Sequence, residues 1–149
     1  MIQKGLTISV AESCTGGLIS SIITSIPGSS DVFECGFITY SNIAKNKILD
    51  VSKDTLNNYG AVSEEVVKAM VEGALEKSKA NLGVAISGIA GPGGGSPQRP
   101  VGTVCLAWKL NDFPAISVTE VFEGTREEVR FQSVTKALKE AINLLKEDN

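Results

Sequence analysis

The feature that most constrains the fold is a change of pattern within residues 6–26. The run "LTISVA" (6–11) is apolar, rich in β-formers and short enough for a buried strand. The polar segment "ESCTGG" (12–17) follows it directly. Apolar residues then recur at helical spacing until Pro27–Gly28, namely Leu18, Ile19, Ile22, Ile23 and Ile26. This order predicts a strand, a tight turn and a helix, the unit from which α/β proteins are built.

The rest of the chain first continues this alternation and then places two strands in succession. We expect further strands at 32–40, 82–90, 101–110 and 115–124, with a glycine- and proline-rich loop at 91–100. Helices are expected over 41–51, after the cap Ser63, and after a capping box from Thr125 to Glu128. The last helix carries on one face Val134, Leu138, Ile142 and Leu145. Residues 1–149 are therefore predicted to form a single three-layer α/β/α domain with a mixed sheet of about five strands.

Composition excludes several classes of protein. The chain of 149 residues is 42% hydrophobic with a net charge of −3, which predicts neither a nucleic-acid nor a membrane partner. The N-terminus lacks the layout of a signal peptide. The three cysteines, Cys14, Cys35 and Cys105, form no C-x-x-C pair, so neither a zinc site nor a disulfide framework is expected. A reducing cytoplasm is the expected location.

The chain contains no histidine. This excludes Ser-His-Asp and Cys-His catalysis as well as histidine-based metal sites. A nucleophile in this chain must be activated by lysine, tyrosine, a carboxylate or a helix terminus. We expect neither a metal nor a cofactor.

The turn "ESCTGG" has two interpretations. In the structural one, Ser13 or Thr15 caps the following helix, and Gly16 and Gly17 allow the tight turn. In the functional one, a hydroxyl group is a nucleophile and the N–H groups at the helix start hold an oxyanion. Cys14 competes as nucleophile, but alternation directs its side chain into the core.

The segment "YSNIAK" (40–45) offers an activating group. The expected helix cap is Ser41 or Asn42. If it is Asn42, Lys45 is the third helical residue, where the helix dipole and desolvation lower the pKa of an ammonium. Lys45 can then act as a general base for a serine, and Tyr40 can hydrogen-bond the serine, the lysine or a substrate. The alternative is a solvated helix lysine and an aromatic residue at a strand end.

A third polar segment, "SGIAGPGGGS" (87–96), follows another predicted strand. It lacks the Gly-Lys-Ser/Thr of a phosphate-binding loop, although a nest of its N–H groups can hold a phosphate or carboxylate. It can equally be a flexible surface loop. Ser87 lies at the strand end, where it can face the same cleft as the first two segments. Because ligands bind beyond the carboxyl ends of strands in open α/β sheets, the three segments are predicted to form one site.

Six ordered motifs resemble the C-terminal domain of the CinA (competence/damage-inducible) family, from about Leu6 to about Leu145. They are "AESCTGG", "YSNIAK", "GAVSEEV", "SGIAGPGGG", "PVGTV" and "EGTREEVR". The resemblance implies a three-layer α/β/α fold that is commonly dimeric. It also implies hydrolysis of the carboxamide of nicotinamide mononucleotide, giving nicotinate mononucleotide and ammonia. Many relatives carry a further N-terminal domain that this sequence does not match, so no activity of that domain is expected.

The resemblance assigns roles to residues of this chain. It implies that Ser13 is the nucleophile and that Tyr40 and Lys45 are its catalytic partners. Ser87 matches the hydroxyl residue of the glycine-rich motif, and Arg126 matches an arginine that could contact the phosphate. Thr125 stands where many relatives have aspartate, and either residue can cap a helix.

The expected mechanism joins these assignments. Lys45, with Tyr40 assisting, takes the proton of Ser13, which attacks the carboxamide, and the N–H groups around Thr15 and Gly16 hold the oxyanion. The glycine loop at 91–95 or Arg126 would bind the phosphate. The predicted substrate-binding residues are Thr15, Gly16, Gly17, Asn42, Ser87, Gly91, Gly93 and Arg126.

Two other classes of function were weighed. One is a non-catalytic nucleotide- or protein-binding module of the same fold, linked to competence or DNA damage. The other is a phosphohydrolase, for which the chain offers no histidine and no clustered Asp-x-Asp. The partners expected for the preferred function are a small nucleotide substrate and further copies of the chain.

Overall fold

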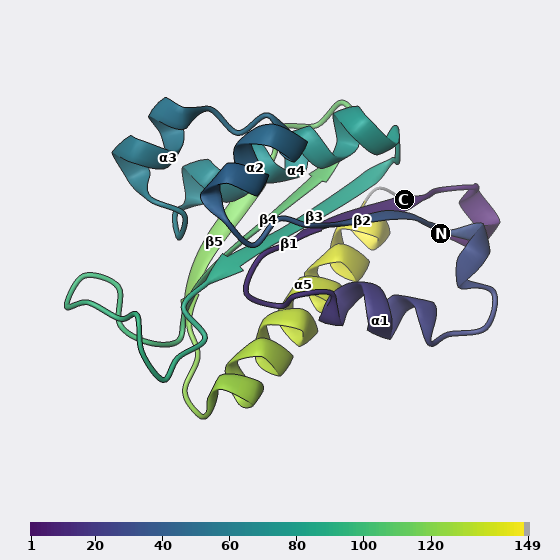
Figure 1. The fold of residues 1–149 in the computed structure, drawn as a ribbon. Helices are drawn as coiled ribbons and strands as arrows, with labels where there is room; N and C mark the ends of the chain where they lie inside the picture. The colour runs from purple at the N-terminus through teal and green to yellow at the C-terminus, as the bar shows by residue number, and fades with distance from the viewer. Residues whose placement is uncertain (148–149) are drawn as a thin grey trace.

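The fold is a five-stranded sheet covered by helices on both faces, as the computed structural model of residues 1–147 shows (Figure 1). The strands are β1 (Ile8–Glu12), β2 (Phe33–Ile38), β3 (Leu82–Gly88), β4 (Thr103–Leu110) and β5 (Ile116–Val121). The α-helices are α1 (Leu18–Thr24), α2 (Asn42–Leu49), α3 (Lys53–Tyr59), α4 (Glu64–Ser78) and α5 (Arg126–Glu147), and Ile2–Lys4 and Ser29–Asp31 are short 3-10 helices. This confirms the predicted α/β class with a mixed five-stranded sheet.

The strand order is β2-β1-β3-β4-β5. β1 is parallel to both β2 and β3, whereas β3, β4 and β5 pair antiparallel. The chain leaves β1 for α1 on one face of the sheet and leaves β2 for α2 on the other (Figure 1). The carboxyl ends of β1 and β2 therefore border a topological switch point, the place where open α/β sheets form ligand sites.

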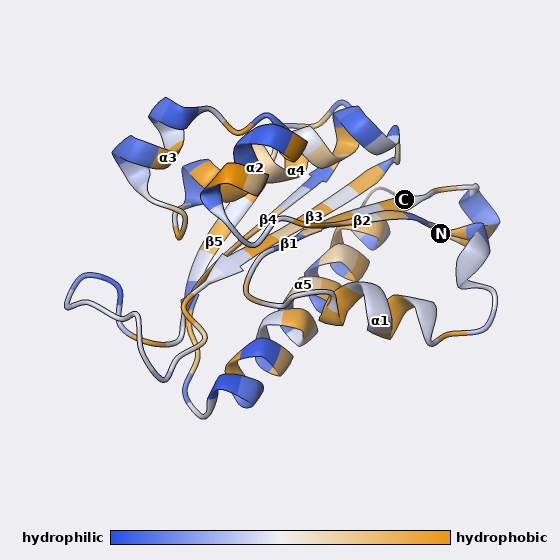
Figure 2. Ribbon diagram, in the orientation of Figure 1, coloured by the Kyte–Doolittle hydropathy of each residue, from blue (hydrophilic) through white to orange (hydrophobic). Residues whose placement is uncertain are grey.

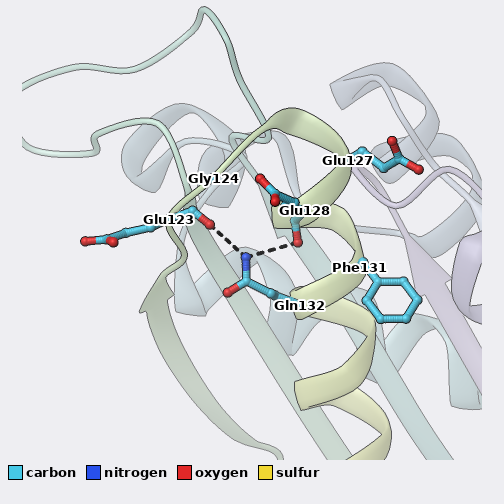
Figure 3. A pocket seen from close by; sticks show the side chains of 6 residues that line it. All are labelled: Glu123, Gly124, Glu127, Glu128, Phe131 and Gln132. Carbon is cyan, nitrogen blue, oxygen red and sulfur yellow. Dashed lines mark hydrogen bonds between the residues drawn. The ribbon is translucent and has the colours of Figure 1, made fainter.

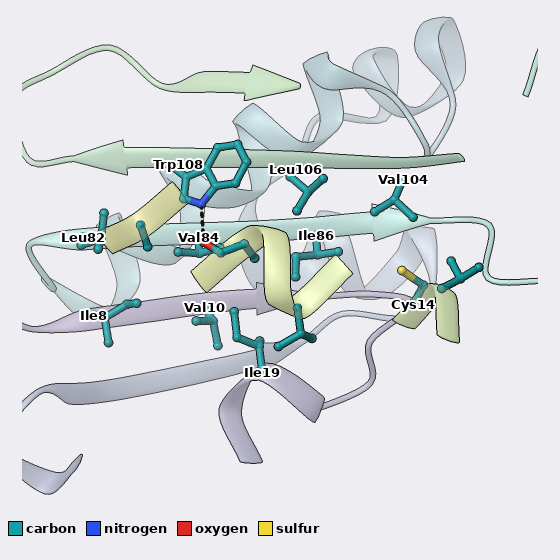
Figure 4. Packing of buried hydrophobic residues seen from close by; sticks show 14 of the residues in the cluster. Ile8, Val10, Cys14, Ile19, Leu82, Val84, Ile86, Val104, Leu106 and Trp108 are labelled. Carbon is teal, nitrogen blue, oxygen red and sulfur yellow. Dashed lines mark hydrogen bonds between the residues drawn. The ribbon is translucent and has the colours of Figure 1, made fainter. Parts of the chain in front are cut away.

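Two hydrophobic layers hold the helices to the sheet. Large aliphatic side chains of β1, β3 and β4 pack against α1 and α5, and Trp108 donates its indole N–H to the Ala137 carbonyl at 2.9 Å (Figure 4). The opposite face carries small side chains, including Ala11, Ala85 and Ala107, which bring α4 close to the sheet. Figure 2 shows hydrophobic residues concentrated on the strands and on the inner sides of the helices. Both faces of the central strands β1 and β3 are thus buried, as is usual for the inner strands of a sheet covered on both sides.

Most of the predicted elements are confirmed, with two corrections. The short helix α3 was not predicted, because Leu56 is its one buried residue and supplies no periodic signal. On α5, Ile142 is exposed, and the buried stripe passes through Val134, Ala137 and Ala141. Of the two expected caps of α2, the structure has Ser41, whose hydroxyl accepts the N–H of Ala44, so Asn42 is the first helical residue and Lys45 the fourth.

The capping box of α5 is confirmed in both directions. The Glu128 carboxylate accepts the Thr125 N–H at 2.6 Å, and the Thr125 hydroxyl accepts the Glu128 N–H at 3.3 Å. Within residues 1–147, no helix is both long and apolar enough to cross a membrane.

Candidate active site

Ser13 lies in a tight turn immediately after β1. Its N–H donates to the Ile86 carbonyl at 2.9 Å, which extends the pairing of β1 with β3 by one residue. The Gly16 N–H then donates back to the Ser13 carbonyl at 3.1 Å. Gly16 and Gly17 have φ values of 55° and 102°, which glycine adopts without strain. The two glycines therefore let the chain turn sharply from the strand into α1.

The side chain of Lys45 reaches Ser13 from the other side of the switch point. Lys45 lies on α2 and is completely buried (0% exposed). Its Nζ is 2.9 Å from Ser13 Oγ, 2.8 Å from the Thr39 carbonyl oxygen and 3.1 Å from the Tyr40 carbonyl oxygen. An ammonium has three protons, and these three acceptors use all of them. The structure thus brings together the first two polar segments.

Burial changes the acidity of this lysine. Desolvation lowers the pKa of Lys45 to about 8, and the nearby Cys14 thiol opposes the shift. Near neutral pH a useful fraction of Lys45 is therefore a free amine. The two carbonyl groups still accept its two remaining protons, so its lone pair points to Ser13 Oγ. This is the geometry of a general base.

Cys14 is not placed to compete with Ser13. Its side chain packs in the hydrophobic layer beneath α1 and α5, which confirms the predicted orientation (Figure 4). Burial raises the pKa of the Cys14 thiol to about 11, so it stays protonated and unreactive near neutral pH.

The start of α1 differs from the prediction. Neither Ser13 nor Thr15 caps this helix, since its cap residue is Gly17. Instead, the buried carboxylate of Glu12 accepts the N–H groups of Gly17, Ile19 and Ser20 at 3.1, 3.2 and 3.0 Å. The oxyanion role expected for the Gly16 N–H is therefore corrected, because this group already donates to the Ser13 carbonyl. The N–H of Gly17, a predicted substrate-binding residue, is likewise held by Glu12.

Two other N–H groups of the turn remain available. Within residues 1–147, the N–H groups of Cys14 and Thr15 donate no hydrogen bond to another residue. They directly follow Ser13 in the chain. A pair of free N–H groups beside a nucleophile can stabilise an oxyanion.

Arg130 holds the outer side of the same turn, which the sequence interpretation missed. Its Nε donates to the Cys14 carbonyl at 3.1 Å and its Nη2 to the Thr15 carbonyl at 2.9 Å. In a trans peptide the C=O and the following N–H point in opposite directions. Because Arg130 holds the Cys14 carbonyl, the N–H of Thr15, in the same peptide group, points away from the Arg130 side chain. The signal available in the sequence was an arginine directly after Val129 in the buried stripe of the last helix.

Arg126 joins the third polar segment to Tyr40. Its Nη1 donates to the Gly91 carbonyl at 2.7 Å, and its Nη2 lies 3.4 Å from the Tyr40 hydroxyl. The Tyr40 side chain is 62% exposed. In this arrangement the Tyr40 carbonyl, and not its hydroxyl, contacts Lys45 and Ser13.

The remaining predicted residues have other partners or surroundings, although Ser87 follows Ile86, the β3 partner of Ser13. Ser87 is buried, and its hydroxyl donates to the Ala61 carbonyl at 2.7 Å, so it ties β3 to the segment before α4. Asn42 lines a groove between α2 and α3 together with Lys53 and Leu56. Gly93 is exposed in the loop that projects between β3 and β4 (Figure 1). Within residues 1–147, no hydrogen bond joins Ser13 to any of these three residues.

Unpaired hydroxyl groups also gather beside the Ser13–Lys45 pair. Within residues 1–147, two buried side-chain polar atoms have no hydrogen-bond partner, and they are the Oγ1 atoms of Thr15 and Thr39. Thr15 belongs to the turn of Ser13, and Thr39 supplies a carbonyl to Lys45. Unsatisfied buried polar groups are rare and concentrate at functional sites.

A separate pocket at the start of α5 is a poor site for an anion. It is lined by Glu123, Gly124, Glu127, Glu128, Phe131 and Gln132, and Figure 3 shows Gln132 bridging the carbonyls of Glu123 and Glu128. Its three carboxylates repel a phosphate. None of the predicted site residues lines this pocket.

The fold and the cluster define a class of protein, a three-layer α/β domain with a buried serine–lysine pair at the carboxyl end of its first strand. Residues 1–145 match the CinA C-terminal domain family, and the chain belongs to that family.

Several relatives show how far this similarity extends. The chain is 50% identical over 135 residues to the "Nicotinamide-nucleotide amidohydrolase PncC" of Escherichia coli, covering 91% of this chain and 82% of that protein. The protein of the same name from Enterobacter agglomerans is 49% identical, covering 93% and 85%. A "CinA-like protein" of Akkermansia muciniphila is 60% identical over 108 residues, where the match covers 72% of this chain but only 26% of the longer relative.

Solved structures agree with the fold. The crystal structure of the competence/damage inducible protein CihA from Agrobacterium tumefaciens superimposes with a TM-score of 0.93 and 46% identity. The alignment covers 96% of this chain and 87% of that one.

Proposed function

We propose that this protein is an amidohydrolase that converts nicotinamide mononucleotide to nicotinate mononucleotide and ammonia. This proposal rests on the hydrogen bond between Lys45 Nζ and Ser13 Oγ. The lysine is buried, and its pKa is lowered to about 8. The two relatives named nicotinamide-nucleotide amidohydrolases, which match over most of their own length, support the choice of substrate.

In the proposed reaction the free amine of Lys45 takes the proton of Ser13 as Oγ attacks the carboxamide carbon. The N–H groups of Cys14 and Thr15 donate to the resulting oxyanion. The C–N bond then breaks, and Lys45 gives its proton to the departing ammonia. Water attacks the acyl-enzyme ester, Lys45 takes a proton from it, and Ser13 recovers its own proton as the nicotinate product leaves.

The positions of the Tyr40 and Arg126 side chains suit binding of the substrate phosphate better than proton transfer to or from Ser13. The Arg126 guanidinium lies beside the Tyr40 hydroxyl and the Gly91 carbonyl, so one cation and one hydroxyl group face the same region. We assign them to the phosphate, in place of the role of Tyr40 as an assistant to the base.

The direct test is ammonia release from nicotinamide mononucleotide by purified protein, with no metal added and with a chelator present. Stoichiometric ammonia and nicotinate mononucleotide support the proposal. Binding of the nucleotide without turnover would favour the non-catalytic module instead, and release of inorganic phosphate would indicate a phosphohydrolase.

Assembly and location belong to the same proposal. Exposed apolar side chains on edge strand β2 and on α2, such as Ile38 and Ile43, support a homo-oligomer. Light scattering coupled to size exclusion will measure its mass. All three cysteines are free thiols, which supports a cytoplasmic location.

A further inference from the structure

Glu12 is a buried carboxylate directly before the nucleophile, and the proposed reaction assigns it no step. Its side chain is 0% exposed, and no salt bridge within residues 1–147 involves it. Its oxygens accept three N–H groups at the start of α1 and also the Ser20 hydroxyl at 2.7 Å. An isolated buried charge is costly. Without a paired cation, the Glu12 carboxylate depends for its stabilisation on these donors and on the positive end of the helix dipole.

Glu12 and Ser13 point to opposite faces of the sheet. Alternation along β1 places Glu12 on the α1 face, where it meets the helix start, and Ser13 on the α2 face, where it meets Lys45. A shift of the strand end that moved one of these side chains would move the other as well.

A hydrogen bond to Glu12 also fixes the far end of the turn that contains Ser13. The turn 13–16 is held at its first residue by the Ser13–Ile86 hydrogen bond and beyond its last residue by the bond from the Gly17 N–H to Glu12. Between these two anchors lie the unpaired N–H groups of Cys14 and Thr15. With both ends fixed, their direction is set before a substrate arrives.

We propose that Glu12 is a positioning residue, which holds turn 13–16 in the conformation that presents Ser13 Oγ to Lys45 and leaves the N–H groups of Cys14 and Thr15 free. This inference rests on the proposed function, because the oxyanion donors matter only in an acyl-transfer reaction.

The direction of the carboxylate matters as well as its hydrogen bonds. A carboxylate facing Lys45 would favour the ammonium form and remove the base. Pointed at α1, Glu12 has its charge balanced by backbone N–H groups, and it is not among the groups that raise the pKa of Lys45. The placement anchors the turn and leaves the base intact.

Glu12→Gln tests the inference because it keeps the size of the side chain and removes its charge and one acceptor. At a temperature where circular dichroism shows the variant fully folded, we expect kcat to fall about 10- to 100-fold, as a displaced reacting group predicts. We expect KM to stay within about twofold and the pH at which kcat/KM rises to stay unchanged. A role in stability alone would lower the melting temperature and leave kcat of the folded enzyme as it was.

Glu64→Gln is the matched control. Glu64 is a carboxylate at the start of α4 that accepts the hydroxyls of Ser117 and Thr119 at 2.6 and 3.0 Å, and these lie on β5, three strands away from β1. We expect this variant to lose stability and to keep the kcat of wild type. An equal fall of kcat in both variants would overturn the positioning role, as would an unchanged kcat in folded Glu12→Gln.

Two further measurements cover the remaining outcomes. If Glu12→Gln does not fold, Ser20→Ala removes only the hydroxyl that donates to Glu12, and an unchanged kcat in that variant overturns the inference. If the wild-type protein releases no ammonia, the proposed function is wrong, and the role of Glu12 in holding the turn is tested separately. Amide exchange then decides about Glu12, since faster exchange at Gly16 and Gly17, whose N–H groups are hydrogen-bonded in wild type, supports the anchor in Glu12→Gln and unchanged exchange refutes it.

Discussion

Lys45 Nζ donates to Ser13 Oγ at 2.9 Å although 32 positions separate the two residues in the chain. The contact exists because β1 and β2 are adjacent and parallel, so the turn after one strand meets the helix that follows the other. The same topology buries the lysine, and burial lowers its pKa to about 8. The position of Lys45 and its lowered pKa therefore have one structural cause.

Separate substitutions of Ser13 and of its neighbour Cys14 show which of the two is the nucleophile. Ser13→Ala is expected to lower kcat at least about 10³-fold, because no other activated hydroxyl group lies beside Lys45. Cys14→Ala keeps the backbone N–H and removes only a buried thiol, so most of the activity should remain while stability falls by about 1 kcal/mol. Steady-state ammonia release and urea unfolding measure the two effects. Loss of activity in Cys14→Ala with retention in Ser13→Ala would reverse the assignment.

The pH profile reports the protonation of Lys45. The base must be the free amine, and desolvation lowers its pKa to about 8. Below that pH, kcat/KM should therefore fall about tenfold per unit, and above it a plateau is expected. Rates with nicotinamide mononucleotide across this range will locate the inflection. An inflection near the ordinary lysine pKa of 10.5 would mean that Lys45 is not desolvated when it acts.

The sequence predicted that Ser13 and Lys45 lie together, which the structure shows, but not what holds them. The absence of histidine made a lysine a candidate activating group, and the resemblance to the CinA family singled out these two residues. The sequence predicted no role for Glu12, because the hydroxyls and glycines that follow it already account for a tight turn. An acidic residue that ends an apolar strand before a helix was the available signal. The contact of Arg130 with the turn depends on how α5 crosses the sheet, which periodicity does not specify.

The stability of the protein should also depend on the protonation of Lys45. A lysine pKa that is lower in the folded state than in the unfolded state means that unfolding takes up a proton between about pH 8 and 10.5. The free energy of unfolding therefore rises with pH through this window. Relative to Lys45→Met, which lacks the group, wild type should gain about 2 kcal/mol between about pH 7.5 and about pH 9.5. Urea unfolding of both proteins at both pH values measures the difference. Parallel changes in the two proteins would contradict the lowered pKa.

Discrimination between the nucleotide and its nucleoside tests the role of Arg126. Its guanidinium lies beside the Tyr40 hydroxyl, and a charge-assisted bond to phosphate is worth about 1.5–3 kcal/mol. Arg126→Ala should therefore raise KM for nicotinamide mononucleotide about 10- to 100-fold. With nicotinamide riboside, which has no phosphate, wild type and Arg126→Ala should have the same kcat/KM within about twofold. A comparable loss with both substrates would indicate that Arg126 acts by holding the Gly91 carbonyl and the loop, and not by binding the phosphate.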